Sequence, residues 1–155
     1  MSLEIERKFL VTGDFVKDAR SSVRVIQGYL CSDPDRTVRI RTADERAYIT
    51  IKGKTAKSGI SRFEWEKEIL KSDALELLKL CEPSVIEKTR YFIESGNHIF
   101  EVDVFFGDNE GLIVAEIELK TENEEFSRPA WLGREITGEL KYYNSNLSRR
   151  PFKSW

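Results

Sequence analysis

The sequence has little of the chemistry that stabilises small secreted domains or zinc-binding domains. Its 155 residues contain two cysteines, Cys31 and Cys81, and one histidine, His98. Two distant cysteines with a single histidine cannot build a disulfide framework or a tetrahedral zinc site. We therefore interpret both cysteines as ordinary reduced thiols.

Long apolar runs and an excess of positive charge are also missing. No stretch approaches the roughly 18 apolar residues of a membrane-spanning helix, and the chain opens on charged residues instead of a signal-peptide core. The 25 Lys and Arg residues are offset by 27 Asp and Glu residues, for a net charge of -2. This balance excludes a basic nucleic-acid-binding domain. We expect a cytoplasmic protein with no nucleic-acid partner and no membrane partner.

The composition favours one folded domain. The chain is 40% hydrophobic and includes 9 Phe, 5 Tyr and 3 Trp. A chain of this size can bury roughly 70% of its unfolded surface, so disorder is not expected. Glycine and proline are scattered, and repeats and linkers are absent from the sequence. We expect a single domain over residues 1–155.

Alternation of apolar and polar residues predicts about eight strands, and short turn-forming segments between them fit antiparallel neighbours. Three helical pieces are expected: one over residues 72–80, one starting at Thr121 with Glu124 at capping-box spacing, and a short one between residues 129 and 147. The fold class is therefore α+β, with the sheet dominant. The expected strands are Leu3–Val11, Arg24–Leu30, Thr37–Thr42, Ala47–Lys52, Ser61–Leu70, Val85–Ile93, His98–Phe105 and Leu112–Lys120.

Seven of these strands carry a charged face opposite an apolar one. Residues two apart on a strand point the same way, so Glu4, Glu6 and Lys8 share a face that is opposite Ile5 and Phe9. The same sorting in the other strands collects seven cations and eight carboxylates. The cations are Lys8, Arg39, Arg41, Lys52, Arg62, Lys88 and Arg90, and the carboxylates are Glu4, Glu6, Glu64, Glu66, Glu101, Asp103, Glu116 and Glu118.

Two arrangements of the charged face remain open from the pattern. An open sheet with its charged side in water is the ordinary meaning of such alternation. Against it, this face concentrates charges and holds almost no Ser, Thr or Gln. If about eight strands close into a barrel, the charged face becomes a lumen and the apolar face is covered from outside by helices.

A charged lumen of this kind would suit metal-assisted phosphoryl transfer. Paired carboxylates on two strands, Glu4 with Glu6 and Glu116 with Glu118, are the oxygen ligands that Mg2+ or Mn2+ prefers. Arginine forks and lysine ammonium groups bind the successive charges of a phosphate chain. In such reactions most of the rate comes from positioning and charge stabilisation.

Several stretches resemble one family in their residues and their order. Glu4-Ile5-Glu6-Arg7-Lys8 resembles the Glu-x-Glu-x-Lys signature of the CYTH family, the triphosphate tunnel metalloenzymes. The further matching stretches, which extend the resemblance over nearly the whole chain, are Arg39-Ile40-Arg41, Glu87-Lys88-Thr89-Arg90-Tyr91, and Glu101-Val102-Asp103 with Glu116-Ile117-Glu118.

The resemblance implies a fold and a set of roles. The fold is an eight-stranded antiparallel closed β-barrel, a tunnel with a charged lumen that a few short helices cover from outside. Tyr29 resembles a tyrosine that pairs with the lysine at Lys88 to position the attacking water, although a barrel-wall aromatic is an equal alternative. Glu116 and Glu118 complete the implied catalytic set. The implied phosphate-binding residues are Lys8, Arg39, Arg41, Lys52, Arg62, Lys88 and Arg90, and the implied ligands of Mg2+ or Mn2+ are Glu4, Glu6, Glu116, Glu118 and Asp103.

Members of this family catalyse several reactions. Gln27-Gly28-Tyr29-Leu30, and Pro129-Ala130-Trp131-Leu132-Gly133 followed by Thr137, resemble the short bacterial inorganic triphosphatases. That group usually has Asp, then Arg or Lys before Tyr, where this chain has Glu139 and Lys141-Tyr142.

We therefore expect hydrolysis of inorganic triphosphate by metal-activated water, with nucleoside triphosphates as a second substrate class. The alternatives are a class IV adenylate cyclase, which converts ATP to cyclic AMP and pyrophosphate, and a non-catalytic module that binds polyphosphate or nucleotide. Trp131 and Trp155 suit a homodimer contact as well as core packing.

Overall fold

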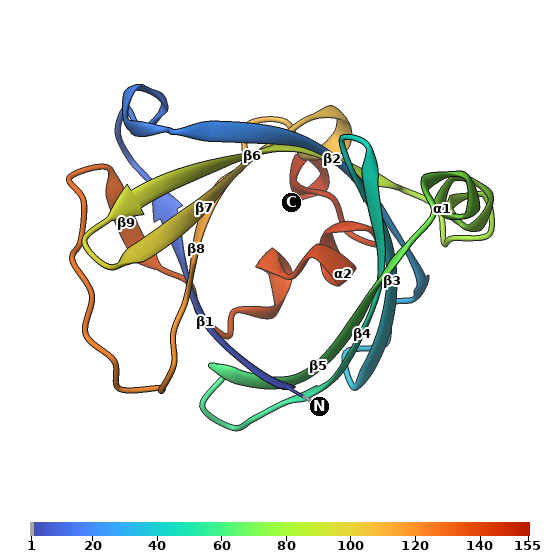
Figure 1. The fold of residues 1–155 in the computed structure, drawn as a ribbon, viewed down its shortest axis with the longest axis horizontal. Helices are drawn as coiled ribbons and strands as arrows, with labels where there is room; N and C mark the ends of the chain where they lie inside the picture. The colour runs from blue at the N-terminus through green and yellow to red at the C-terminus, as the bar shows by residue number, and fades with distance from the viewer. Residues whose placement is uncertain (1) are drawn as a thin grey trace.

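The computed structural model describes residues 2–155, so residue 1 of the expected domain lies outside the described residues. Eight antiparallel strands lie in the order β5-β4-β3-β2-β6-β7-β8-β1, and pairing of β5 with β1 closes them into a barrel (Figure 1). The predicted closed barrel is thus confirmed. The strands are β1 (Ser2–Val11), β2 (Ser21–Cys31), β3 (Arg36–Ala43), β4 (Arg46–Thr55), β5 (Ser61–Ile69), β6 (Ile86–Ser95), β7 (His98–Phe105) and β8 (Ile113–Glu118).

Strand β1 is the seam of the barrel because it pairs with three strands. Its first residues, 2–5, pair with β5, and residues 6–10 pair with β8. A ninth strand, β9 (Leu132–Glu135), pairs with the end of β1 after a register shift between Phe9 and Val11. The barrel itself therefore has eight strands, and β9 is an outer addition.

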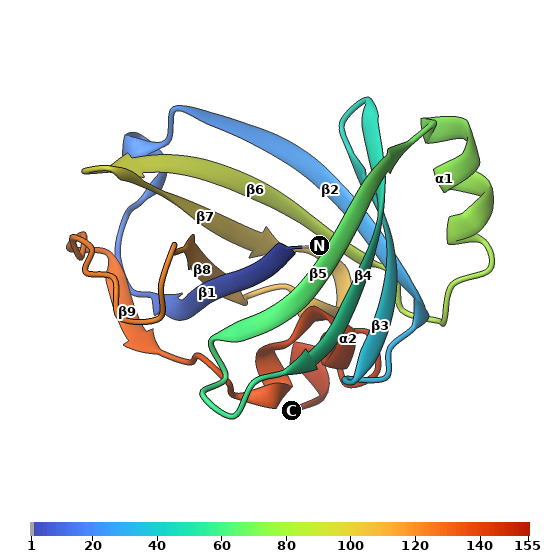
Figure 2. The ribbon, with the colours of Figure 1, turned by 60° about the horizontal axis from the view of Figure 1, so that its bottom comes forward.

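The helices lie in two places. Helix α1 (Lys71–Leu78) packs outside the barrel against β2, β3 and β4 (Figure 1). The C-terminal segment carries η3 (Leu140–Tyr142), α2 (Asn144–Leu147) and η4 (Phe152–Ser154), and it lies across one end of the barrel (Figure 2). Two further 3-10 turns, η1 (Val16–Asp18) and η2 (Gly107–Asn109), lie in connections.

The apolar faces of the strands point outward and are covered there. Phe9 and Phe100 are fully buried in a cluster with Trp131, while Ile40 and Ala47 are fully buried against Ala74 of α1. This burial outside the barrel leaves the charged faces inside. Among residues 2–155, no helix combines the length and the apolar character of a membrane span.

The prediction of a helix starting at Thr121 is wrong. Residues 121–131 contain two turns joined by chain without regular secondary structure: the Glu124 N–H donates to the Thr121 carbonyl at 3.2 Å, and the Leu132 N–H donates to the Pro129 carbonyl at 3.0 Å. The Glu124 carboxylate accepts a bond from the backbone N–H of Lys120 at 2.6 Å instead of capping a helix. The segment packs across the barrel wall, where Phe126 contacts the rings of Phe9 and Phe100.

The region between residues 129 and 147, expected to hold one short helix, contains β9 as well as η3 and α2. Of the two tryptophans considered for a dimer contact, Trp131 is 4% exposed and belongs to the core. Trp155 is 42% exposed and packs against the rings of Tyr142 and Phe152.

Candidate active site

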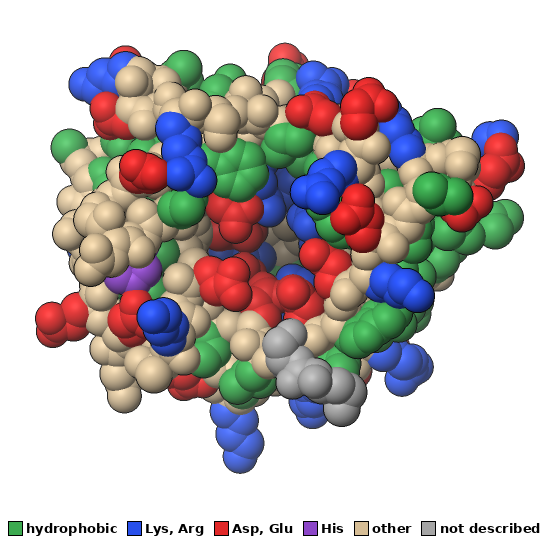
Figure 3. Space-filling view, viewed as in Figure 1, with side chains coloured by type: hydrophobic (Ala, Val, Ile, Leu, Met, Phe, Trp, Pro, Cys, Tyr) green, Lys and Arg blue, Asp and Glu red, His purple; other side chains and the backbone are tan. Residues whose placement is uncertain are grey.

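The barrel encloses a cavity of about 250 Å³ that the charged strand faces line. A hollow opens at one end of the barrel, where acidic side chains surround it and basic side chains lie deeper (Figure 3). This arrangement excludes the open, solvated sheet. All seven predicted cations, seven of the eight predicted carboxylates and Tyr29 line the cavity. The cations are Lys8, Arg39, Arg41, Lys52, Arg62, Lys88 and Arg90, and the carboxylates are Glu4, Glu6, Glu64, Glu66, Glu101, Glu116 and Glu118.

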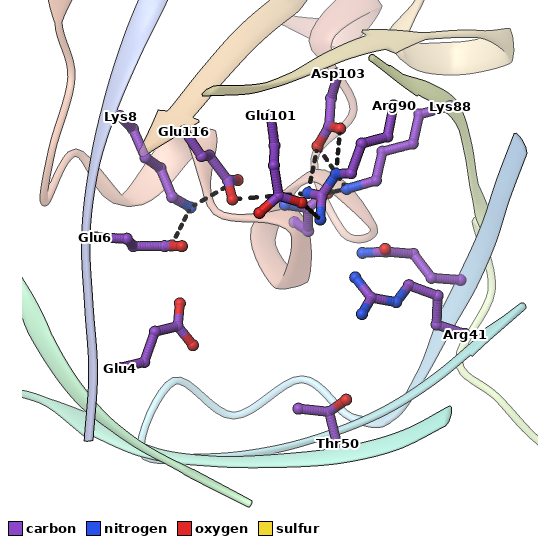
Figure 4. Close-up of polar contacts among 12 residues, drawn as sticks. Glu4, Glu6, Lys8, Arg41, Thr50, Lys88, Arg90, Glu101, Asp103 and Glu116 are labelled. Atoms are coloured by element: carbon purple, nitrogen blue, oxygen red, sulfur yellow. Dashed lines mark hydrogen bonds and ion pairs between the residues drawn. The ribbon is translucent and has the colours of Figure 1, made fainter. Parts of the chain in front are cut away.

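One wall of the cavity is an ion-pair network centred on Arg90 (Figure 4). Arg90 Nε and Nη2 donate to the two carboxylate oxygens of Asp103 at 2.8 and 2.9 Å, and Nη1 donates to Glu101 at 2.7 Å. The Lys88 ammonium lies 2.8 Å from Asp103 Oδ2. Asp103 is fully buried and does not line the cavity.

This placement does not fit the metal role expected for Asp103. Both of its oxygens already accept bonds from cations, and a buried carboxylate that loses them would leave uncompensated charges. Burial alone would raise the pKa of Asp103, but Arg90 and Lys88 hold that pKa well below its ordinary value. Asp103 instead orients two cations.

Burial and the nearby carboxylates shift the pKa values of Lys88 and Arg90. Burial lowers the pKa of Lys88 to about 8 despite the nearby Asp103. Burial acts in the same direction on Arg90, but Asp103 and Glu101 raise its pKa well above the ordinary value. Lys88 is therefore a cation that can lose its proton near physiological pH, and Arg90 is not.

A neighbouring part of the wall, separated from β6 only by β2, holds two arginines beside one carboxylate. Arg39 and Arg41 lie 3.5 and 3.4 Å from Glu66, whose carboxylate also accepts a bond from the Thr50 hydroxyl at 2.7 Å. Burial and the neighbouring Arg39 lower the pKa of Arg41 to about 10, which leaves it charged at neutral pH. Two arginines sharing one carboxylate keep capacity for an anionic ligand.

Strand β1 contributes charges to the side of the cavity that faces Arg41 (Figure 4). Lys52 Nζ lies 2.7 Å from Glu4 Oε2, and Lys8 Nζ lies 3.7 Å from Glu6 and 3.9 Å from Glu116. Burial would lower the pKa of Lys8, but the carboxylates Glu116 and Glu6 raise it. Lys8 therefore remains charged, and it points into the cavity (Figure 4).

A divalent cation fits best beside Glu6 and Glu118. These two carboxylates are directly opposite each other in the β1–β8 ladder, where like charges repel. Burial and then the neighbouring Glu4 raise the pKa of both Glu6 and Glu118. Within residues 2–155, Glu118 has no ion-pair partner. A bound cation would relieve this repulsion.

The four carboxylates expected as metal ligands do not form a ready set. In the described part of the chain, no three acidic, histidine or cysteine side chains are grouped to hold a metal. Glu4 is paired with Lys52, and Glu116 lies near Lys8 and Arg90. A metal here would complete its coordination with ligand oxygens and water, as Mg2+ commonly does.

The closed end of the cavity contains residues that the strand pattern could not reveal. Tyr143 lies under Lys8 and Arg62, with its ring centroid 4.8 Å from Lys8 Nζ. Asn144 Oδ1 accepts a bond from Lys88 Nζ at 3.2 Å. Tyr143 lies between η3 and α2, and Asn144 is the first residue of α2; this segment has no apolar period, so alternation gives no signal for either residue. Lys141, which the sequence brought to attention, is exposed and lies over Trp155 instead of the cavity.

Tyr29 lies in the cavity wall and also in an apolar cluster with Ile86 and Phe105. Its hydroxyl oxygen accepts a bond from Gln27 Nε2 at 3.4 Å, and Gln27 is fully buried. Tyr29 is therefore a buried wall aromatic that also lines the cavity. Both interpretations of Tyr29 are compatible with its placement.

The cavity can hold a chain of phosphates against the cations of its wall. Its charges are fixed by ladders of the barrel and by mutual pairing, so little reorganisation is needed when an anion binds. The carboxylates at the mouth and the cations deeper inside provide separate places for a metal ion and for phosphate oxygens.

Comparisons with known proteins find relatives along nearly the whole chain. The model of the CYTH domain matches residues 2–152. An inorganic triphosphatase of Acetivibrio thermocellus is 47% identical over 156 residues, covering 100% of this chain and 99% of that protein. An inorganic triphosphatase of Nitrosomonas europaea is 35% identical, covering 94% of this chain and 96% of that protein.

The fold has a solved counterpart as well. The crystal structure of the inorganic triphosphatase NE1496 superposes with a TM-score of 0.67 at 31% identity, covering 96% of this chain and 95% of that one. Triphosphatases of this family are in general metal-dependent. The match over residues 2–152 and the two relatives show that the chain belongs to the CYTH family.

Proposed function

We propose that this protein hydrolyses inorganic triphosphate with the help of Mg2+ or Mn2+. The observation that carries the proposal is the closed cavity in which seven cations face a repelling carboxylate pair, Glu6 and Glu118. The two curated relatives that are named inorganic triphosphatase support the same substrate.

In this proposal the cations of the cavity wall bind and orient the phosphate chain. Arg39 and Arg41 on β3 and Arg90 and Lys88 on β6, which only β2 separates, hold it together. Glu6 and Glu118 hold the metal, with Glu4 and Glu116 near it. The metal, when bound, supplies charge neutralisation and lowers the pKa of a water molecule. Tyr29 and Lys88 orient the attacking water and the terminal phosphate.

The test is phosphate release from triphosphate with each divalent ion. Glu6→Gln and Glu118→Gln remove metal-binding charge at nearly constant volume, and we expect turnover to fall by about 100-fold or more in each. Glu87→Gln is the matched control, because Glu87 is exposed on β6 and pairs with Arg24 outside the cavity. Wild-type turnover in both cavity variants would refute their roles.

Product analysis separates the alternatives. With ATP as substrate, ADP and phosphate are the products expected of a hydrolase, whereas cyclic AMP and pyrophosphate would identify a cyclase. Tight triphosphate binding without turnover under any divalent ion would identify a non-catalytic binding module. Either of these two results would overturn the proposal.

Some expectations about partners go with this proposal and stay predictions. The partner proposed for the cavity is a small-molecule triphosphate, and no nucleic-acid or membrane partner is expected. A homodimer contact remains an open prediction only for Trp155, the more exposed of the two tryptophans. A cytoplasmic location also stays a prediction.

A further inference from the structure

The ammonium group of Lys88 is held from two sides at the closed end of the cavity. Its Nζ lies 2.8 Å from Asp103 Oδ2 and donates to Asn144 Oδ1 at 3.2 Å, and its side chain is 1% exposed. A lysine ammonium has three N–H donors in a tetrahedral arrangement. Two of them are engaged, so one is left for a ligand in the cavity that Lys88 lines.

The two acceptors differ in charge and in origin. Asp103 is an anion on β7, and it is shared with Arg90. Asn144 is neutral and belongs to α2, which lies across the end of the barrel. An amide oxygen can direct an N–H without cancelling the positive charge, whereas a second carboxylate would neutralise it.

Asn144 is presented by a firmly anchored segment. Its neighbours Ser145 and Leu147 are 3% and 0% exposed, and the Asn144 carbonyl accepts a bond from the Ser148 N–H at 3.0 Å. The side chain before it, Tyr143, is 8% exposed and covers Lys8. The C-terminal segment therefore does more than close the barrel, because its residues lie against three of the cations, Lys8, Arg62 and Lys88.

We propose that Asn144 is a positioning residue that fixes the Lys88 ammonium, so that its remaining N–H points at the triphosphate. This inference rests on the proposed function. A lysine side chain has four rotatable bonds, and its ammonium must be held in one direction to contribute to orientation of the reacting groups. Asp103 alone fixes one of the three donor directions and leaves rotation about it free.

Three variants test the proposal kinetically. Asn144→Ala removes the acceptor, and we expect kcat to fall by about tenfold while KM changes by less than about threefold, because orientation is lost and charge is kept. Asn144→Asp keeps the acceptor but adds a negative charge, so KM for triphosphate is expected to rise. Asn146→Ala is the matched control on the same helix, since Asn146 contacts only the Leu140 carbonyl and Arg149 through its side chain.

A second readout follows the Lys88 ammonium directly, without turnover. Lysine labelled at Cε is titrated by NMR, and Lys88→Met assigns its signal. We expect the titration midpoint of Lys88 to rise in Asn144→Asp and to fall in Asn144→Ala, because the first adds a carboxylate and the second removes an acceptor. Asn146→Ala should leave the midpoint in place.

The outcomes separate the inference from the proposed function. If the wild type releases no phosphate from triphosphate, the proposed function fails, and the opposite NMR shifts still decide whether Asn144 holds Lys88. Midpoints that do not move in opposite directions overturn the inference. Wild-type kcat in Asn144→Ala, or a loss no larger than in Asn146→Ala, overturns it as well.

Discussion

Asp103 is a buried carboxylate that pairs with two cations, Arg90 and Lys88, and orients them. It accepts two bonds from Arg90 and lies 2.8 Å from the Lys88 ammonium, all without exposure to the cavity. Alternation along β7 could predict that Asp103 faces inward. It could not predict that pairing with its neighbours would occupy both oxygens, because that depends on the register of β6 against β7.

Asp103→Asn is expected to destabilise the fold strongly. The change leaves Arg90 and Lys88 buried beside a neutral amide, and breaking such a pair costs about 3–5 kcal/mol in the free energy of unfolding. Urea denaturation at neutral pH measures this loss. Glu87→Gln breaks the half-exposed pair with Arg24 and should cost only about 0–1 kcal/mol. Equal losses in the two variants would contradict the buried pairing.

The contribution of Asp103 should also disappear in acid. Its pKa in the folded protein lies well below the ordinary value, so below about pH 4 the unfolded chain binds a proton that the folded protein does not. The free energy of unfolding then falls as pH falls. We expect the difference between wild type and Asp103→Asn, measured by denaturation from pH 7 to pH 3, to shrink in that range. A constant difference would refute the lowered pKa.

At the scale of elements, Gly28 on β2 shows how closely the chain after α1 packs on the barrel. A Cβ at this position would lie 2.9 Å from the Cβ and 3.0 Å from the Sγ of Cys81, which follows α1 along the chain. The stretch Gln27-Gly28-Tyr29-Leu30 therefore combines a residue of the cavity wall with a close contact on the outer face. No local sequence pattern explains the glycine, because the contact joins segments that are far apart along the chain.

Gly28→Ala should lower the free energy of unfolding by about 1–3 kcal/mol, because the added methyl overpacks this contact. Combining it with Cys81→Gly removes the atoms that the methyl would meet. Urea denaturation of the two single variants and of the pair should show a loss smaller than the sum of the single losses. Strictly additive losses would show that the contact is not the cause.

The segment after β8 shows why one element was mispredicted. Thr121 and Glu124 have the local spacing of a helix start, but the apolar residues that follow are used for packing across the wall. Phe126 lies 5.9 Å from Phe9, and Trp131 lies 5.4 Å from Phe100, between ring centroids. An extended chain reaches both contacts, so tertiary packing decides against the local helix signal.

At the scale of the whole molecule, alternation predicted the strands and every cation of the cavity because a strand has a strict period of two. Closure of the barrel was not predicted by alternation. Pairing of β5 with β1 depends on the shear and tilt of all eight strands, which no single segment encodes, and it was predicted only through the family resemblance. The short helices at the closed end have no periodic pattern of apolar residues, so their positions were not predicted.

Triphosphate should stabilise the whole barrel, because it binds the folded cavity and not the unfolded chain. At 100 times its dissociation constant, a ligand adds about 2.7 kcal/mol, which raises Tm by roughly 5–10 °C for a chain of this size. Differential scanning fluorimetry with triphosphate and Mg2+ measures the shift. Arg41→Gln should reduce it, and Glu87→Gln should not. A shift of zero in the wild type would contradict an anion-binding cavity.

The seam at β1 has a consequence for how the chain folds. Glu6 on β1 pairs with Glu118 on β8, so β1 lacks one of its partner strands until β8 has formed. Contacts between such distant residues form slowly, since a long loop must be ordered first. We therefore expect folding to pass through an open sheet whose two free edges can pair with other chains. Closure of the barrel at β1 removes these free edges.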